Sequence, residues 1–457
     1  MNKVGVVVIG GGPAGYVLAR RLGQMGIDTV LVEREHLGGT CLNRGCIPTK
    51  ALYAATVPLG KKEVYARMGL DVEIHVELSR LRAFVSGVVE KLRDGIAHLL
   101  SSAKVEVLRG EGRLRGPGEV EVIGESRSEK IQAKAVVLAT GSVPVELPFL
   151  PFDGEKIWSS DHALQLPLVP ERMVVVGGGV VGLELATLYR RLGAKVVVVE
   201  MMDSLLPGVG LSRRGVAFLM QALLRQGIEI RLNTAAVGLT KSGLLVRGTR
   251  EEEIGADVIL VAVGRRPRSE GLGLEKLGVQ VEKGIVRTDS CFLAAPGIYA
   301  IGDLRGGALL AHKASHEGLL LAETLGLELR GQKPSSLAFP RAMPWAVFTQ
   351  PEIALVGAPV ETPGLKVARF PFSALGRAWA EGEPEGFVTF ASDEAGKIVG
   401  IEIIGPHATE LIGEGLLAVE LGLSLGDLAR AIHPHPTFTE ALWETALYAL
   451  GRPLHFG

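Results

Sequence analysis

The sequence lacks most features of secreted, membrane-spanning and nucleic-acid-binding proteins. Its 457 residues include three cysteines and no uninterrupted run of about 18 apolar residues, which argues against a disulfide-rich scaffold and a membrane span. The net charge of −1 argues against a polyanionic partner such as nucleic acid. The opening MNKVGVVVIGGG runs into a strand pattern without a cleavage motif, so we expect a cytoplasmic protein that contacts no membrane.

The composition instead favours a large folded core. Hydrophobic residues make up 47% of the chain and charged residues 22%, and the length suits roughly two to four domains. There are 60 glycines, many of them in short clusters, which is typical of backbone positions that approach a ligand closely.

A glycine motif near the start of the chain predicts a dinucleotide site. A β-branched run leads into Gly10-x-Gly12-x-x-Gly15, a helical pattern follows, and a second apolar run ends on Glu33. These glycines permit a tight turn, contact with a pyrophosphate and close packing of helix on strand, while the acid can accept from ribose hydroxyls. A purely structural turn is the alternative.

The same strand–helix–strand unit recurs over residues 172–200. It contains Gly177, Gly179 and Gly182 and ends on Glu200, so the repeat predicts a second nucleotide-binding domain. A carboxylate at this position repels a 2′-phosphate and therefore favours NAD over NADP, unless Glu200 is only a solvated charge.

Three further apolar runs, at residues 135–144, 257–267 and 297–307, suit parallel strands that are buried on both faces. The last of these runs brings Asp303 to a strand's carboxyl edge, where ligands of open α/β sheets bind. Beyond about residue 335 the pattern predicts antiparallel strands and helices in a third, α+β domain.

Two of the three cysteines lie in one loop, GGTCLNRGCIPTK. On a regular helix the Cα atoms of Cys41 and Cys46 would lie about 8 to 9 Å apart, whereas a disulfide needs less than about 7 Å. A bond between them therefore requires a distorted turn, which Gly45 and Pro48 favour. Two unbonded buried thiols or a zinc site are the alternatives. The remaining Cys291 is expected to be a buried packing residue.

The stretch HPHPTFTE offers a base. Pro436 keeps His435 out of a helix, and Glu440 could return to one ring nitrogen and leave the other for a thiol. By itself a His-Pro turn is more often structural, and we interpret His433 in that way. A metal site at His312 and His316 is disfavoured.

Together these motifs, with VAVGRRP, IGDL and AHKASHEG, resemble the class I pyridine nucleotide–disulfide oxidoreductases, and within them the branch that oxidises dihydrolipoamide. The resemblance covers essentially the whole chain. It implies an α/β fold of two Rossmann-like domains and a C-terminal α+β dimerisation domain. The implied segments are residues 1–143 (FAD-binding, first part), 144–264 (NAD-binding), 265–334 (return to the FAD-binding part) and 335–457 (dimerisation).

The resemblance also implies roles for individual residues. Cys46 should exchange electrons with FAD, Cys41 should meet the dithiol substrate, and Lys50 should pair with Glu184. His435 should be the base and Glu440 its orienter, reaching the active site of the other subunit. The implied FAD contacts are Gly10, Gly12, Gly15, Glu33, Thr40, Lys50, Gly112, Thr140, Gly141, Asp303 and Ala311, and the implied NAD contacts are Gly177, Gly179, Gly182, Glu200 and Gly264.

The expected activity is a flavin-dependent dihydrolipoamide:NAD oxidoreductase with a Cys41–Cys46 redox disulfide and no metal. The expected partners are a second copy of the chain and the lipoyl and subunit-binding domains of an acyltransferase. The alternatives are an NAD(P)H-dependent reductase of glutathione or a similar disulfide, and a non-catalytic subunit of a dehydrogenase complex. Arg44 departs from the family, which commonly has a small apolar residue there.

Overall fold

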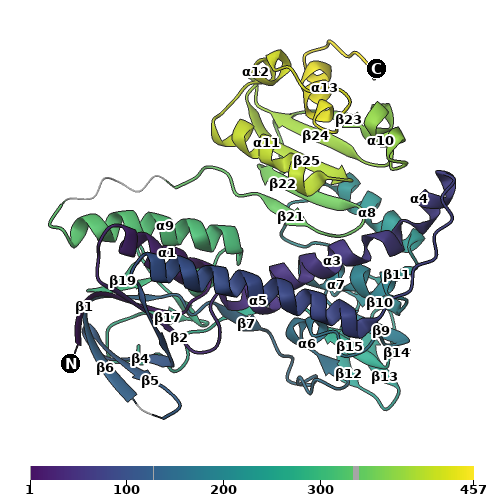
Figure 1. The fold of residues 1–457 in the computed structure, drawn as a ribbon. Helices are drawn as coiled ribbons and strands as arrows, with labels where there is room; N and C mark the ends of the chain where they lie inside the picture. Colours follow the sequence, from purple (N-terminus) through teal and green to yellow (C-terminus); the bar gives the residue numbers. More distant parts are fainter. Residues whose placement is uncertain (1, 127, 333–338, 457) are drawn as a thin grey trace. The chain divides into compact units, whose positions relative to one another are not determined.

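The computed structural model describes residues 2–126, 128–332 and 339–456, and the chain divides into two compact units (Figure 1). The first unit comprises Met1–Ala51, Ser79–Val145 and Gly264–Ala338, and the second comprises Leu52–Leu78, Glu146–Val263 and Phe339–Gly457. The four segments predicted from the sequence instead end at residues 143, 264, 334 and 457. The division into four functional segments remains a prediction.

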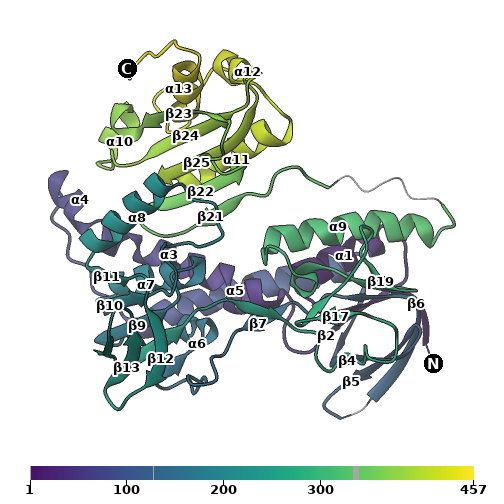
Figure 2. The ribbon, with the colours of Figure 1, turned by 180° about the vertical axis from the view of Figure 1, so that it is seen from behind.

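The first unit is built on an eight-stranded mixed sheet. Its spatial order is β19 (Leu293–Ala295), β20 (Ile298–Ala300), β6 (Ser128–Leu138), β1 (Asn2–Ile9), β2 (Thr29–Glu33) and β3 (Glu106–Arg109), while β4 (Glu111–Gly116) and β5 (Glu119–Ile123) continue from β6. The strands from β20 to β3 are parallel. Strand β5 pairs antiparallel with β4 on one side and with β6 on the other, and Figure 2 shows β4 next to β5.

The central strand β1 is buried on both faces because its residues alternate between two hydrophobic cores. Val6 and Val8 belong to one core, and Val7 and Ile9 belong to the other. Helices α1 (Pro13–Gln24) and α9 (Ala311–Glu328) lie side by side in Figures 1 and 2 and contribute to the core around Val6 and Val8. A continuous apolar run is thus a fully buried parallel strand, as its pattern predicted.

The second unit contains the repeat of this arrangement. Its parallel sheet has the order β11 (Ile228–Arg231), β10 (Lys195–Val199), β9 (Arg172–Val176), β15 (Val258–Val261) and β8 (Ile157–Trp158). Helices α7 (Val180–Arg191) and α8 (Arg213–Arg225) follow β9 and β10 in the chain. An antiparallel sheet is formed by β12 (Ala235–Leu239), β13 (Gly243–Arg247) and β14 (Glu251–Gly255).

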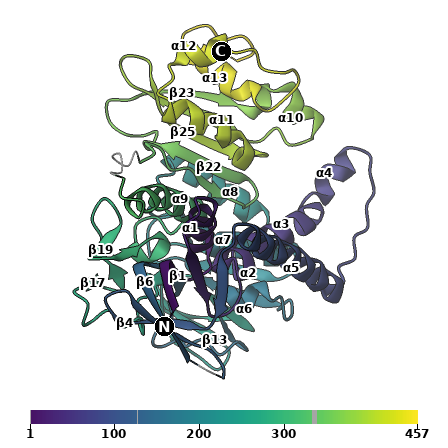
Figure 3. The same cartoon turned by 60° about the vertical axis from the view of Figure 1, so that its left-hand side comes forward.

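The second unit also contains the C-terminal antiparallel sheet. Its order is β21 (Trp345–Val347), β22 (Glu352–Gly357), β25 (Ile398–Gly405), β24 (Phe387–Ser392) and β23 (Lys366–Pro371). Figure 3 shows α11 (Ala408–Glu420) along this sheet and α12 (Leu425–Arg430) next to α13 (Glu440–Ala449). The sheet and these helices share one hydrophobic core, which confirms the predicted α+β domain.

The remaining helices and strands complete the described part of the chain. They are α2 (Gly39–Arg44), α3 (Cys46–Gly60), α4 (Lys62–Arg67), α5 (Leu78–Ser102), β7 (Ser142–Pro144), α6 (Ser160–Leu164), β16 (Arg265–Pro267), β17 (Val281–Glu282), β18 (Ile285–Val286), the 3₁₀ helices η1 (Gly302–Arg305) and η2 (Phe372–Ala374), and α10 (Gly376–Ala380). Among the helices of the described residues, none has the length and hydropathy needed to cross a membrane. The predicted fold class, with two parallel nucleotide-binding sheets and a C-terminal α+β domain, is confirmed.

Candidate functional site

The cysteine loop is a break between two helices. Helix α2 ends at Arg44, and α3 begins at Cys46. Gly45 between them has φ −145° and ψ −116°, which is outside the helical region. A Cβ atom at Gly45 would lie 2.9 Å from the carbonyl oxygen of Thr40, so a larger residue would force the two helix ends apart. The structure therefore has the interruption that the cysteine spacing requires.

The break brings the two thiols together. Neither Cys41 nor Cys46 is in a disulfide in the structure. A hydrogen bond to Cys46, together with burial, raises the pKa of the Cys41 thiol, and the positive charge of Lys50 opposes this rise. The Cys46 residue is exposed.

Lys50 lies one helical turn after Cys46 in α3, and its charge reaches the thiol pair. Its predicted partner Glu184 is buried in α7, where its Oε1 accepts a hydrogen bond of 2.9 Å from the backbone N–H of Phe348. Lys50 belongs to the first unit and Glu184 to the second. Their pairing remains a prediction.

Arg44, the residue that departs from the family pattern, forms an ion pair with Glu35. Arg34 contacts the same carboxylate at 2.5 Å. The charges that act on the Cys41 thiol are those of Cys46 and Lys50. Arg44 is therefore engaged by the segment after β2, and we expect it to have little influence on thiol acidity.

The first glycine motif has the shape of a dinucleotide cradle. Gly12 is the N-cap of α1, and a Cβ atom there would meet nothing closer than the Gly39 Cα at 3.8 Å. At Gly15, in contrast, a Cβ atom would lie 1.9 Å from the Gly10 carbonyl oxygen. The space at Gly12, directly before the N-terminus of α1, fits the pyrophosphate of FAD.

Glu33 is fixed at the end of β2 by the backbone around it. Its two carboxylate oxygens accept hydrogen bonds of 2.7 Å from the N–H groups of Gly11 and Glu35. Burial raises the pKa of Glu33, although backbone hydrogen bonds from Gly11 and Arg34 and the charges of Arg34 and Arg44 oppose the rise. Each oxygen keeps a lone pair for a ribose hydroxyl, because a carboxylate can accept about four hydrogen bonds.

The other predicted FAD residues all lie in the first unit, several of them at the carboxyl edge of its parallel strands. Thr140 and Gly141 follow β6, and Asp303 follows β20. The predicted strand that was to end on Asp303 stops at Ala300, and Asp303 lies on η1 instead. Thr40 lies in α2, Gly112 in β4, and Ala311 is the first residue of α9. Open space beside Gly141, where a Cβ atom would meet nothing within 4 Å, also fits a bound cofactor.

The second glycine motif repeats this geometry in the second unit. Gly179 is the N-cap of α7, and a Cβ atom there would meet nothing within 4 Å. Glu200 is buried and accepts from the N–H groups of Gly178 at 2.6 Å and Met202 at 2.8 Å. Gly264 belongs to the first unit, so its predicted contact with NAD remains a prediction.

His435 and Glu440 form the predicted pair. The Nδ1 atom of His435 lies 2.8 Å from Oε1 of Glu440, while the other oxygen of Glu440 accepts from the N–H of Thr437 at 2.8 Å. The imidazole side chain is 77% exposed, and its Nε2 atom has no hydrogen-bond partner in the described part of the chain. This arrangement holds one ring nitrogen and leaves the other available for proton transfer.

His433 differs from His435 because both of its ring nitrogens have partners. Its Nε2 atom lies 2.7 Å from Glu414, and its Nδ1 atom lies 3.3 Å from the carbonyl oxygen of Ala431. His312 and His316 are exposed on α9. Within residues 2–126, 128–332 and 339–456, no group of three or more His, Cys, Asp or Glu side chains is placed to hold a metal ion. The expectation for Cys291 was wrong: it is exposed, in the turn before β19, and its N–H is donated to Asp289.

Sequence reasoning missed Ser142 and Arg265. Ser142 donates to Asp303, and Arg265 donates to Ser142. The only signal in the sequence was their position beside motif glycines, in ATGS and VGRR.

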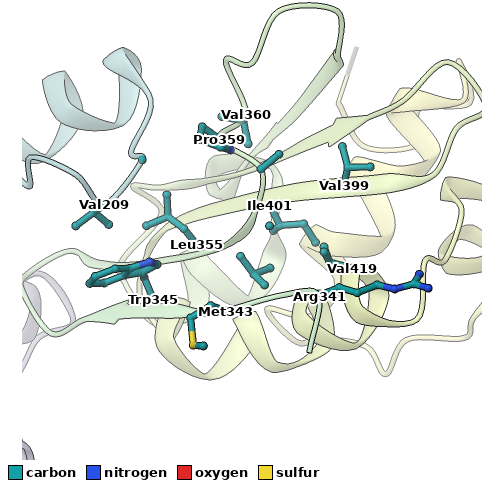
Figure 4. Close-up of a pocket in the computed structure, with 14 residues that line it drawn as sticks. Val209, Arg341, Met343, Trp345, Leu355, Pro359, Val360, Val399, Ile401 and Val419 are labelled. Carbon is teal, nitrogen blue, oxygen red and sulfur yellow. The ribbon is translucent and has the colours of Figure 1, made fainter. Parts of the chain in front are cut away.

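A separate pocket of about 370 Å³ lies in the second unit (Figure 4). Among its described lining residues Arg341 is the one charged side chain, and Val209, Leu355 and Ile401 contribute apolar surface. It contains none of the predicted site residues.

Comparison with known proteins defines the class to which this fold and site belong. Residues 4–318 match the pyridine nucleotide-disulphide oxidoreductase family, and residues 343–446 match the dimerisation domain of the same family. The chain belongs to the pyridine nucleotide-disulphide oxidoreductases. It is a flavin-dependent disulfide oxidoreductase of a family that uses FAD and NAD(H), and its dimerisation domain supports a homodimer.

Particular relatives narrow the class. Dihydrolipoyl dehydrogenase of Thermus scotoductus is 44% identical to the chain, with 98% of this chain and 97% of the relative covered. A dihydrolipoyl dehydrogenase of Pseudomonas aeruginosa is 42% identical, with 99% of each covered. The crystal structure of LpdA from Mycobacterium tuberculosis has a TM-score of 0.88 at 27% identity, covering 98% of this chain and 99% of that one. Within its family the chain is most like lipoamide dehydrogenase.

Proposed function

We propose that the chain oxidises dihydrolipoamide with NAD. The observation that carries this proposal is the contact between the thiols of Cys41 and Cys46 across the break at Gly45. Two thiols this close can form and open a disulfide without unfolding the loop. The relatives named dihydrolipoyl dehydrogenase, at 42% and 44% identity, support the choice of dithiol.

The first half of the reaction is a thiol–disulfide exchange. A substrate thiolate attacks the sulfur of Cys41 in the oxidised pair, and Cys46 leaves as a thiolate. The second substrate thiolate then attacks the substrate sulfur of this mixed disulfide and releases Cys41. The substrate leaves as a cyclic disulfide, and the cysteine pair holds two electrons. The raised pKa of Cys41 suits this step, because its thiolate is then readily protonated after release.

His435 acts as the proton acceptor for the substrate thiols. Only a thiolate attacks a disulfide, so a base that works near neutral pH accelerates the exchange. The hydrogen bond from Nδ1 to Glu440 fixes the tautomer, which makes Nε2 the basic nitrogen. In the homodimer we propose that this pair serves the cysteine loop of the partner subunit.

The first unit would hold FAD and the second would hold NAD. When bound, FAD would supply the redox chemistry that links the cysteine pair to NAD. Gly12, Thr140, Gly141, Asp303 and Ala311 would hold FAD at the carboxyl edge of the first sheet. Lys50 would lie near its reactive ring.

We expect NAD to be preferred over NADP, because the residues directly after β10 include no basic side chain that could bind a 2′-phosphate. Glu200 occupies this position and is followed by Met201 and Met202, both exposed. Arg231, whose carbonyl oxygen accepts from the N–H of Glu200, has its guanidinium in ion pairs with Glu229 and Glu252.

The proposed physiological electron donor is a lipoyl domain of an acyltransferase, whose subunit-binding domain would hold the homodimer. We also propose a cytoplasmic location, because Cys41 and Cys46 form the proposed redox pair and the third cysteine of the sequence has no second partner for a structural disulfide.

A paired rate assay tests the function. The purified chain is supplied either with dihydrolipoamide and NAD or with NADPH and oxidised glutathione. We expect the first pair to give the larger kcat/KM. A larger value with the second pair would refute the proposal in favour of a glutathione-type reductase, and no turnover with either pair would favour a non-catalytic subunit.

Two histidine variants test the base. His435→Gln should lower kcat for dihydrolipoamide by about 10²- to 10⁴-fold, the usual contribution of a positioned base. His433→Gln is the matched control, because both ring nitrogens of His433 already contact Glu414 and Ala431. We expect it to keep near-normal kcat. Equal losses in the two variants would contradict the assignment of the base.

A further inference from the structure

The carboxylate of Asp303 is held by a side chain to which the sequence analysis gave no role. The hydroxyl of Ser142, a buried residue of β7, donates to Oδ2 of Asp303 at 2.6 Å. In the described part of the chain, Oδ1 of Asp303 accepts no hydrogen bond. One oxygen is therefore engaged by the protein, and the other is left for a ligand.

Arg265 decides the direction of this hydrogen bond. Its Nε atom donates to the Ser142 hydroxyl at 2.8 Å, and its Nη2 atom donates to the Ser142 carbonyl oxygen at 2.8 Å. A guanidinium has donors only and stays charged, so the Ser142 oxygen must accept from it. The single hydroxyl proton is then left for Asp303, which receives a charge-assisted hydrogen bond.

The backbone beside Asp303 is fixed by a second carboxylate. Buried Glu317 of α9 accepts from the N–H of Gly302 at 2.7 Å and from Arg305 at 2.8 Å. Both bonds hold η1, the short helix that carries Asp303. With its backbone and one oxygen both fixed, the Asp303 carboxylate has little freedom to turn.

We propose that Ser142 is a positioning residue for FAD binding. Its hydroxyl orients the carboxylate of Asp303, and Arg265 sets the direction of that hydroxyl. The inference rests on the proposed function, in which Asp303 contacts FAD. Preorganisation of a binding group raises affinity because less freedom is lost on binding. FAD should therefore bind more weakly when the Ser142 hydroxyl is removed, although Ser142 need not touch the cofactor.

The test measures the Kd for FAD of the full-length apoprotein, prepared by stripping flavin, and its melting temperature without FAD. Ser142→Ala should raise the Kd about tenfold, as expected for a lost hydrogen bond to a charged group. Ser142→Thr, which keeps a hydroxyl, should restore most of the affinity. Ser269→Ala is the matched control, since Ser269 is a buried serine of the same unit.

A double-mutant cycle that combines Ser142→Ala with Arg265→Met tests whether Arg265 acts through Ser142 or affects FAD binding independently of it. If Arg265 acts on Asp303 through Ser142, the double variant should bind FAD no more weakly than the worse single variant. The absorption band of bound flavin should return in every variant at saturating FAD.

The proposal is overturned if Ser142→Ala binds FAD within about twofold of the wild type. It is equally overturned if the losses in the cycle multiply, or if weaker binding tracks a lower apoprotein melting temperature that Ser142→Thr does not restore. A wild-type chain that binds no FAD at all would instead refute the proposed function, so the two failures are distinguishable.

Discussion

Two neighbouring glycines of the second motif should separate cofactor binding from folding. Gly179 and Gly182 lie three residues apart at the start of α7, yet their surroundings are opposite. A Cβ atom at Gly179 would meet nothing within 4 Å, whereas one at Gly182 would lie 2.0 Å from the Gly177 carbonyl oxygen. Gly179→Ala should therefore affect the NAD site, and Gly182→Ala should affect the fold.

The magnitudes follow from these contacts. The distance from a Cβ atom at Gly182 to the Gly177 carbonyl oxygen is about 1.4 Å shorter than the ordinary limit of 3.4 Å. This oxygen belongs to the backbone, so the start of the helix would have to move. Overpacking of this kind typically costs about 1–3 kcal/mol of unfolding free energy. At Gly179 the backbone angles, φ −79° and ψ −177°, are accessible to alanine. The loss of a glycine N-cap and the lower entropy of the unfolded chain each contribute up to about 1 kcal/mol with opposite signs.

The assay compares the FAD-loaded variants without and with NAD. Melting without NAD should place Gly179→Ala close to the wild type and Gly182→Ala clearly below it. In a titration with NAD, the Kd of Gly179→Ala should be about 5- to 150-fold higher than that of the wild type. The reason is that the added methyl group would fill the space for the pyrophosphate, at a cost of about 1–3 kcal/mol. The reasoning is refuted if Gly179→Ala loses as much stability as Gly182→Ala, or if it binds NAD as the wild type does.

Three further predictions concern the thiol pair and a buried carboxylate. Cys41→Ser should abolish dihydrolipoamide oxidation and keep bound FAD, as read from turnover and the flavin spectrum, and retained turnover would contradict the electron route. Arg44→Val should leave the pH profile of thiol alkylation nearly unchanged, because an exposed ion pair such as that with Glu35 contributes about 0–1 kcal/mol; a large shift would show that Arg44 acts on the thiols. Burial raises the pKa of Glu402, although hydrogen bonds from Ser212 oppose this rise. The contribution of Glu402 to the free energy of unfolding is therefore fully present below its unfolded pKa and declines as pH rises through its folded pKa. The melting temperature of Glu402→Gln relative to the wild type should therefore rise as the pH increases above the ordinary pKa of glutamate, and a constant difference would contradict the direction of the pKa shift.

Local sequence patterns were enough to predict the nucleotide-binding units. The run before Gly10 must be a parallel strand because every one of its side chains is apolar, and in the structure Val6, Val7 and Val8 are fully buried. The glycine spacing of each motif arises within one turn of backbone, where Gly15 meets Gly10 and Gly182 meets Gly177. The pairing of His435 with Glu440 is similarly local, since the two residues are five apart in the chain.

Interactions between distant segments could not be predicted from these patterns. Cys291 looked like a packing residue by its type alone, but its exposure depends on the turn that precedes β19. Asp303 was expected to end a strand, but β20 stops at Ala300 and Asp303 lies on a 3₁₀ helix. This helix is held by the carboxylate of Glu317, which accepts a hydrogen bond from the N–H of Gly302.

The sequence by itself determined the class of the fold, its two nucleotide motifs and the thiol pair, because each of these depends on residues within a few turns of one another. Only the tertiary structure decided how Asp303 is held. Ser142, Arg265 and Asp303 come from three separate segments, and they meet because β7 pairs with β16 beside the loop that follows β20. No periodicity records such a meeting, since hydrogen bonds between distant residues depend on strand order and register, which the folded chain alone establishes.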